Sequence, residues 1–250
     1  MWTSLGNWLS DPAHWQGPSG VPARTLEHLG YTGLTMVFAL IISLPIGALV
    51  GHSGRGGVAI VGLANGLRAL PSLGILTIVV LVGGLGLAPP IVALVLLGIP
   101  PVLAGTYAGI RAVDPAVVDA ARGMGMREWE ILLKVEVPNA LPLIFGGIRS
   151  AVLQVIATAT IAAYVSLGGL GRYVIDGYAQ LDYAQMLAGA LLVAVLAIVV
   201  DLVLVGVQRL VVSPGIVQSG VSRRRTSTRR ARSRAVTVTG TEAVYTRGNS

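Results

Sequence analysis

The most specific spacing of residue types in this sequence occurs in a charged segment, residues 115–138, that lies between two apolar ones. Its distinctive positions are, in chain order, Asp119, Ala120, Ala121, Gly125, Val135, Val137 and Pro138. Small side chains let the surface of another protein approach closely, and a glycine permits a sharp turn between two helices. The chemistry that this pattern favours is non-covalent docking of a partner, while an ordinary surface hairpin is the plainer interpretation.

Two short helices must position these residues. The Asp-Pro pair at 114–115 is a helix start signal, because aspartate caps the first turn and proline fits the first helical position. We expect one helix over residues 116–124, a break at Gly125 and a second helix over residues 127–135. Pro138, with a further proline after it, is expected to stop the second helix before the next apolar run.

Catalytic and metal-binding constellations are not visible in the sequence. The chain has no cysteine, and its three histidines, at positions 14, 28 and 52, lack metal-ligand spacing. It contains no Walker phosphate-binding motif, no Gly-x-Ser-x-Gly elbow and no His-Glu-x-x-His. We therefore expect no catalytic residue, no metal site and no cofactor in this chain, and a membrane-embedded enzyme is the least favoured class.

The composition indicates an all-α integral membrane protein. Of 250 residues, 54% are hydrophobic and 12% charged, about half the charged share of a soluble domain. Residues 1–26 form a tryptophan-containing arm suited to a membrane interface, and residues 211–250 form a basic tail of disordered composition. Five spans are expected between them, at about residues 29–50, 58–82, 91–110, 143–165 and 186–207, and the second is expected to be broken near residues 70–72.

The distribution of positive charge predicts the orientation of these spans. The net charge of +7 belongs to the tail, where residues 219–250 hold eight Arg and one Glu. With five spans, one side receives Arg55, Arg111, Arg122, Arg127, Lys134 and this tail, and the positive-inside rule makes that side cytoplasmic. We expect a multi-pass protein of the cell membrane with its amino terminus outside. The tail fixes this topology or attracts anionic lipid headgroups, and nothing beside its charge indicates nucleic-acid binding.

Charged and polar residues within the spans are a second group of candidates. Arg68, near Pro71 and Ser72, faces a pore or a subunit interface if it lies deep in the second span. It reaches the membrane surface instead if that helix begins later. Asp201 is more consistent with a packing ion pair than with a functional site, and its candidate partners are Arg149 and Arg209.

The pattern in residues 115–138 resembles the cytoplasmic coupling motif of ABC-importer permeases. That motif reads Glu-Ala-Ala, three residues, Gly, nine residues, Ile-x-Leu-Pro, and this chain keeps every spacing. Its departures are conservative: Asp119 replaces Glu, and Val135 and Val137 replace Ile and Leu. The resemblance covers residues 27–210 and implies the five-helix type I transmembrane domain. The strings LPSLGILTIV and SLGGLGRYVIDG resemble permeases for osmoprotectants such as glycine betaine, carnitine, choline and proline.

This resemblance implies transport by alternating access. The expected partners are cytoplasmic ABC ATPase subunits, a second permease copy or a sister permease, an extracytoplasmic substrate-binding protein and the lipid bilayer. ATP and Mg would be bound by the ATPase, and this chain would carry no cofactor. The seven positions of the motif would form its contact with the ATPase. Two alternatives stay open: an ABC permease for another small solute, such as methionine or phosphonate, and an ATP-independent channel or secondary carrier.

Overall fold

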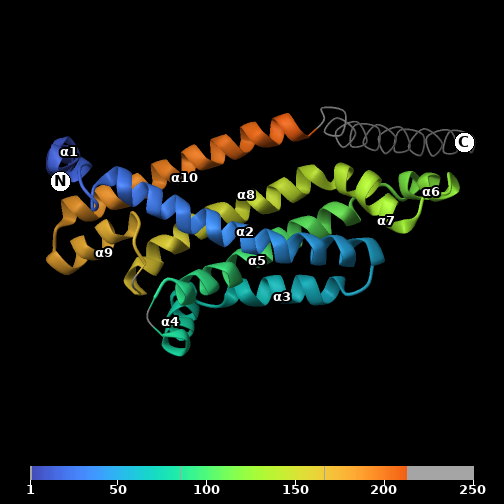
Figure 1. Ribbon diagram of the computed structural model, residues 1–250, viewed down its shortest axis with the longest axis horizontal. Coiled ribbons are helices and arrows are strands. Elements are labelled where there is room, and N and C mark those ends of the chain that lie inside the picture. Colours follow the sequence, from blue (N-terminus) through green and yellow to red (C-terminus); the bar gives the residue numbers. More distant parts are fainter. Residues whose placement is uncertain (1, 85, 166, 213–250) are drawn as a thin grey trace, which may run out of the picture. The chain divides into compact units, whose positions relative to one another are not determined.

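The computed structural model describes residues 2–84, 86–165 and 167–212 (Figure 1). The chain divides into two units, residues 1–208 and 209–250. The helices belong to the first unit, apart from the last residues of α10. Most of the expected basic tail lies outside the described residues. The elements, all helical, are α1 (Trp2–Ser10), η1 (Pro12–Trp15), α2 (Val21–Ser53), α3 (Gly57–Ala69), α4 (Ser72–Gly83), α5 (Ala88–Arg111), α6 (Pro115–Gly123), α7 (Glu128–Ile131), η2 (Leu132–Glu136), α8 (Val137–Ala162), η3 (Ala163–Val165), α9 (Gly171–Gln180) and α10 (Tyr183–Val211).

Four helical stretches are long and apolar enough to cross a membrane. They are Val21–Ser53, Ala88–Arg111, Glu128–Val165 and Tyr183–Val211. A fifth crossing is formed if α3 and α4 act together as one span that bends by 90°. The expected all-α membrane fold is confirmed. Where the second span was expected, α3 and α4 form a bent pair, which is the geometry of a broken span or of a re-entrant loop.

The first membrane helix begins earlier than the sequence suggested, at Val21 rather than near residue 29. Gly20 has an extended backbone conformation, and a proline in the first helical turn favours helix initiation there. The arm predicted over residues 1–26 is therefore shorter, and it is folded. In α1, Leu5 and Trp8 are buried, and the Trp8 ring meets Tyr173 of α9 edge-on at 5.3 Å.

Glycines bring α2, α5 and α8 into close contact at the centre of the first unit. A β-carbon added at Gly105 of α5 would lie 2.7 Å from the Cα of Gly147 in α8. A β-carbon added at Gly51 of α2 would lie 2.7 Å from the side chain of Ile110 in α5. Small residues at helix crossings are the usual means by which membrane helices gain van der Waals contact. These three helices consequently form the frame that positions the segments at their ends.

An ion pair joins α10 to α8. Arg149 donates two hydrogen bonds to the Asp201 carboxylate, from Nε and from Nη2, each 2.9 Å long. The sequence left the partner of Asp201 open, and the structure pairs it with Arg149. Only three residues of α10 are buried in the chain, so this two-point contact is one of the few specific contacts that hold α10 against α8.

The opposite ends of the helices gather two different groups of segments. In the first unit, the α6–α7 region lies at one end, whereas α1 and α9 lie at the other (Figure 1). At the α9 end, the Glu27 carboxylate accepts hydrogen bonds from the Gly169 amide and from Arg24, both at 2.8 Å. The start of α2 is thereby fixed to the glycine-rich segment that precedes α9.

We predict that Gly147→Ala destabilises the fold by roughly 1–3 kcal/mol, the usual cost of overpacking a close contact. The added β-carbon would lie 2.7 Å from the backbone oxygen of Pro101, which cannot easily move. Gly146→Ala is the matched control, since nothing lies within 4 Å of its added β-carbon. Thermal unfolding of both variants in detergent should separate them, and equal stability would contradict the proposed close crossing.

We also predict that Asp201→Leu lowers the thermal stability of the protein in detergent. The substitution leaves Arg149 without its partner in an apolar environment, and an unpaired charge is disfavoured there. The double variant Arg149→Leu/Asp201→Leu should recover much of the lost stability, because it removes both charges. A double variant no more stable than the single one would show that the pair does not act as a unit.

Candidate functional site

The start of the candidate hairpin is built as the sequence predicted. The Oδ1 atom of Asp114 accepts a hydrogen bond from the backbone N–H of Ala116 at 3.0 Å, which caps the first turn of α6. Pro115 occupies the first helical position, where its missing N–H costs nothing. This cap fixes where the chain leaves α5 and where the hairpin begins.

The turn of the hairpin depends on Gly125, which has a φ of +83°. Its amide donates to the oxygen of Arg122 at 2.9 Å, and the Met126 amide donates to the oxygen of Ala121 at 3.2 Å. This pair of hydrogen bonds is the Schellman helix ending, which requires a left-handed residue at the glycine position. The prediction that Gly125 ends the first helix is confirmed.

A small apolar core holds the two arms of the hairpin together. Val118, Ala121 and Ile131 are buried, and Met126 and Val135 pack against them. This arrangement corrects the expectation for Ala121. Its side chain is 2% exposed and faces the second arm of the hairpin, so it closes the hairpin and does not face a partner. Val135 belongs to the same core.

The second arm does not stop at Pro138, contrary to the sequence prediction. It continues from α7 through a π-helical turn, Leu132–Glu136, into α8. A proline cannot donate a backbone hydrogen bond, and the wider turn directly before Pro138 accommodates this loss without ending the helix. Val137 packs against the cluster that contains Ile110 and Ile144. The hairpin is therefore joined to the membrane helix by continuous helical backbone.

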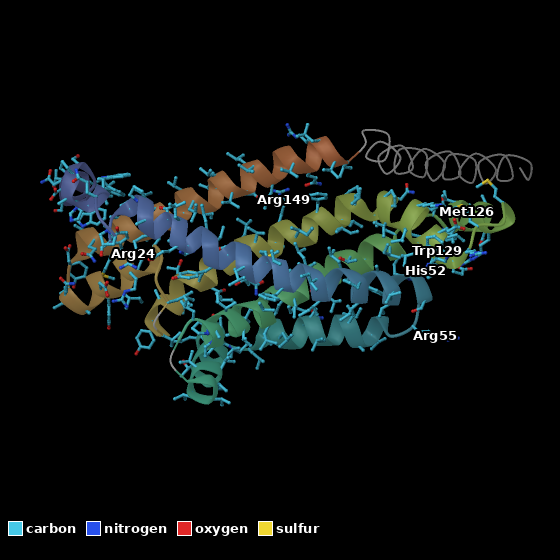
Figure 2. The ribbon with its side chains drawn as sticks, in the orientation of Figure 1. Arg24, His52, Arg55, Met126, Trp129 and Arg149 are labelled. Atoms are coloured by element: carbon cyan, nitrogen blue, oxygen red, sulfur yellow. The ribbon has the colours of Figure 1, made fainter. Side chains whose placement is uncertain are left out.

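The outer face of the hairpin is exposed and has both charged and apolar members. Asp119 and Ala120 are exposed on α6. Met124 is 76% exposed and Trp129 is 55% exposed, high values for side chains of this size. Met126, Trp129 and His52 lie at the hairpin end of the first unit, and Arg24 lies at the opposite end (Figure 2). Exposed large apolar side chains beside charges are typical of a protein-docking surface.

Ion pairs brace this surface across the turn. Arg122 donates to both oxygens of Glu128, at 2.8 and 3.0 Å, and also approaches Asp119 at 3.4 Å. The hydrogen bond with Glu128 raises the pKa of Arg122 further above its usual range, so its cation persists at any physiological pH. The position of Asp119 is thus linked to that of the second arm.

His52 makes contacts with the hairpin that the sequence gave no reason to expect. It lies in the last turn of α2, and its Nδ1 lies 2.6 Å from an oxygen of Glu136. Its Nε2 lies 3.2 Å from an oxygen of Glu128. Glu136 occupies the unspecified position of the Val-x-Val-Pro sequence. No spacing rule connects positions 52 and 136, so only the folded chain reveals this contact.

The other predicted candidates lie away from the hairpin, at the bend between α3 and α4. Arg68 is exposed in the last turn of α3, where a positive charge is favoured by the helix dipole. Since α3 begins at Gly57, the idea that this helix starts late is not supported. Pro71 is the extended residue before α4, and Ser72 is the first residue of α4.

The side chains of the hairpin can bind a partner through apolar contacts and through charge. In the described ranges, no group of three or more His, Asp or Glu side chains is arranged to hold a metal ion. The motif positions divide into two kinds. Asp119, Ala120 and Gly125 are exposed, whereas the others pack at least partly against the hairpin or α8: Ala121, Val135, Val137 and Pro138.

We predict that Gly125→Ala loosens the hairpin, at a cost of roughly 1–2 kcal/mol for a non-glycine residue in the left-handed region. There is open space around an added β-carbon, so the effect would come from the backbone alone. Gly123→Ala is the matched control, because it also has open space but lies within α6. Amide hydrogen exchange across residues 115–131 should rise only in the Gly125 variant, and equal exchange would contradict the assigned role.

Proteins of similar sequence come from membrane transport systems. The family described as binding-protein-dependent transport system inner membrane component matches residues 43–213. The carnitine transport permease protein OpuCB of Listeria monocytogenes is 34% identical over 154 residues, which cover 62% of this chain and 71% of that protein. The glycine betaine/carnitine/choline transport system permease protein OpuCB of Bacillus subtilis is 36% identical with the same coverage. The osmoprotectant import permease protein OsmW of Salmonella typhimurium is 35% identical and covers 63% of this chain and 76% of that protein.

Solved structures of ABC transporters have the same fold as this chain. An inward-facing structure of the MetNI methionine ABC transporter matches with a TM-score of 0.68 and 22% identity, covering 82% of this chain and all of the matched chain. A second crystal form of that transporter gives a TM-score of 0.70 at 23% identity, with the same coverage. The fold is that of a type I ABC importer transmembrane domain. The matched family spans more than half of the sequence, and the chain belongs to the inner membrane components of binding-protein-dependent transport systems.

Proposed function

We propose that this protein is the permease subunit of an ATP-driven importer for a small osmoprotectant such as glycine betaine, carnitine, choline or proline. The support for the cargo class is the set of relatives at 34–36% identity, whose names state carnitine, glycine betaine, choline or osmoprotectant transport. The methionine transporter bears on the fold alone, because its identity to this chain is 22–23%.

The observation that carries the proposal is the placement of the motif on a single exposed hairpin. Its buried residues build the hairpin, and its exposed residues leave an outer face of mixed charge and apolar character. We assign docking of a separate ATPase to this face, with Asp119, Ala120, Met124 and Trp129 as contacts. ATP and Mg would be bound by that ATPase, and this chain would contribute no catalytic residue.

The geometry suggests how a movement of the ATPase would reach the membrane. The hairpin follows α5 after a short capped turn, and it continues through η2 into α8 without a break. Displacement of the hairpin would therefore move α5 and α8 together, because they are in close contact at Gly105 and Gly147. Alternating exposure of a path between two permease subunits, a second copy or a sister chain, would follow from this movement.

The proposed orientation places the hairpin in the cytoplasm and the α9 end outside. The hairpin end of the first unit carries five cations, Arg55, Arg111, Arg122, Arg127 and Lys134, and the positive-inside rule counts cations rather than net charge. At the other end, Arg24 pairs with Glu27 and Arg172 pairs with Asp176. The positive-inside rule then supports an amino terminus outside and a carboxyl terminus in the cytoplasm. The α9 end would face the extracytoplasmic side, where we place the substrate-binding protein.

The bend between α3 and α4 is a candidate for the substrate path or the interface with the second permease subunit. Arg68 is exposed there and has no ion-pair partner among residues 2–84, 86–165 and 167–212. An unpaired cation in a span is disfavoured next to lipid, which supports a neighbour or a water-filled path beside it. Pro71 and Ser72 are assigned to the same region.

We predict that Ala120→Glu lowers co-purification of the ATPase by about tenfold or more, a loss expected at a tightly packed contact. Ala120 is exposed on α6, so the substitution should leave folding intact. Ala179→Glu, at an exposed position of α9, is the matched control.

The experiment uses the tagged protein from its native membrane in mild detergent, with bound proteins identified by mass spectrometry. Uptake of labelled glycine betaine by cells that carry each variant provides the second readout. Recovery of an ATPase with the unchanged protein and the Ala179 variant, but not with the Ala120 variant, is expected. Gradient-driven uptake with no ATPase recovered in any case would favour a channel or secondary carrier.

A further inference from the structure

His52 makes a contact that the docking role of the hairpin does not require. The hairpin is covalently continuous with α5 and α8, but α2 reaches it only through side chains. At the end of α2, the His52 ring lies between the carboxylates of Glu128 and Glu136, at 3.2 and 2.6 Å. His52 and Glu136 are largely buried, with 16% and 8% of their side chains exposed, so the contact between these two is sheltered from water, whereas the Glu128 side chain is 58% exposed.

A positive ring would complement both carboxylates of this contact. Each ring nitrogen faces a carboxylate oxygen, and a carboxylate can only accept hydrogen bonds. A neutral imidazole has one N–H and would leave its other nitrogen, a lone pair, against an anion. A doubly protonated ring would donate a charge-assisted hydrogen bond from Nδ1 to Glu136, and it would also hold its positive charge 3.2 Å from the Glu128 carboxylate as an ion pair.

The backbone around His52 is held in place independently. Gly51 lies so close to Ile110 of α5 that an added β-carbon would overlap with that side chain. On the other side, Glu136 belongs to the π-helical turn that connects the hairpin to α8. The His52 contact therefore connects a fixed end of α2 to the base of the hairpin.

The charges form a continuous series from the docking face to α2. Asp119 approaches Arg122, Arg122 holds Glu128, and Glu128 and Glu136 both face His52. We infer that His52 is a positioning residue for coupling: its cation fastens α2 to the hairpin, so that a displacement of the hairpin moves α2 together with α5 and α8. The role of His52 in transport rests on the proposed function. The attachment of α2 to the hairpin by His52 does not depend on that function.

The first measurement tests the fastening in the purified full-length chain, without any partner. His52→Gln keeps a polar side chain but removes the cation, and amide exchange of residues 128–136 should rise by about tenfold, as expected for loss of a charged hydrogen bond. His52→Lys should restore most of the protection, because an ammonium group can donate to both carboxylates. Arg55→Gln is the matched control, since Arg55 is an exposed cation three residues away for which no ion pair is present in the described ranges.

The same variants then test the role in coupling. In proteoliposomes with the ATPase and the binding protein, His52→Gln should lower the uptake per ATP hydrolysed by about fivefold or more. His52→Lys should recover it, and Arg55→Gln should leave it unchanged. The Glu136→Gln variant should add little to His52→Gln, because the two residues act in one contact.

Three results would overturn the inference. Unchanged amide exchange in His52→Gln would show that the contact does not hold the hairpin. Equal exchange in His52→Gln and His52→Lys would show that charge is not what holds it. Raised exchange with normal uptake per ATP would show that the fastening has no part in coupling. Failure of the unchanged protein to bind any ATPase would count against the proposed function, while the exchange measurement would still decide whether the fastening exists.

Discussion

A close contact between α5 and α8 determines where the other segments of the first unit can lie. It exists because Gly105 and Gly147 have no β-carbon, which lets the two backbones meet where any larger residue would force them apart. The hairpin follows the end of α5 and precedes α8, so the distance between these helices also sets the geometry of the hairpin. Gly51 brings α2 against α5 by the same means, and this contact places His52 beside the hairpin.

Polar contacts supply what the apolar packing cannot specify. Van der Waals contact between two apolar helices allows one helix to shift along the other. An ion pair in an apolar environment prevents such a shift, because it has a defined partner and direction. The Arg149–Asp201 pair fixes the register of α10 on α8. At the hairpin, the carboxylates of Glu128 and Glu136 face His52 and relate the second arm to α2. The outer face of the hairpin is consequently connected to α2 as well as to α5 and α8.

Local sequence signals predicted the hairpin well, since its cap at Asp114 and its turn at Gly125 depend on neighbouring residues. Tertiary context decided the rest. The helix continues past Pro138 because a π-helical turn accommodates the proline, and Ala121 faces inward because the second arm folds over it. Composition predicted the membrane class, and the sequence predicted a break near residues 70–72, but nothing in the sequence predicted the 90° angle between α3 and α4. The His52–Glu136 contact joins residues 84 positions apart, and a single sequence gives no signal for such a pair.

Photo-crosslinking would determine whether an ATPase binds to the outer face of the hairpin. A photoreactive amino acid would be placed at position 124, where Met124 is 76% exposed, and at Tyr178 on α9, which is 69% exposed, as the comparison site. We expect position 124 to crosslink to an ABC ATPase in the native membrane and position 178 not to do so. Crosslinks from position 124 to lipid alone, or equal ATPase crosslinking from both positions, would contradict it.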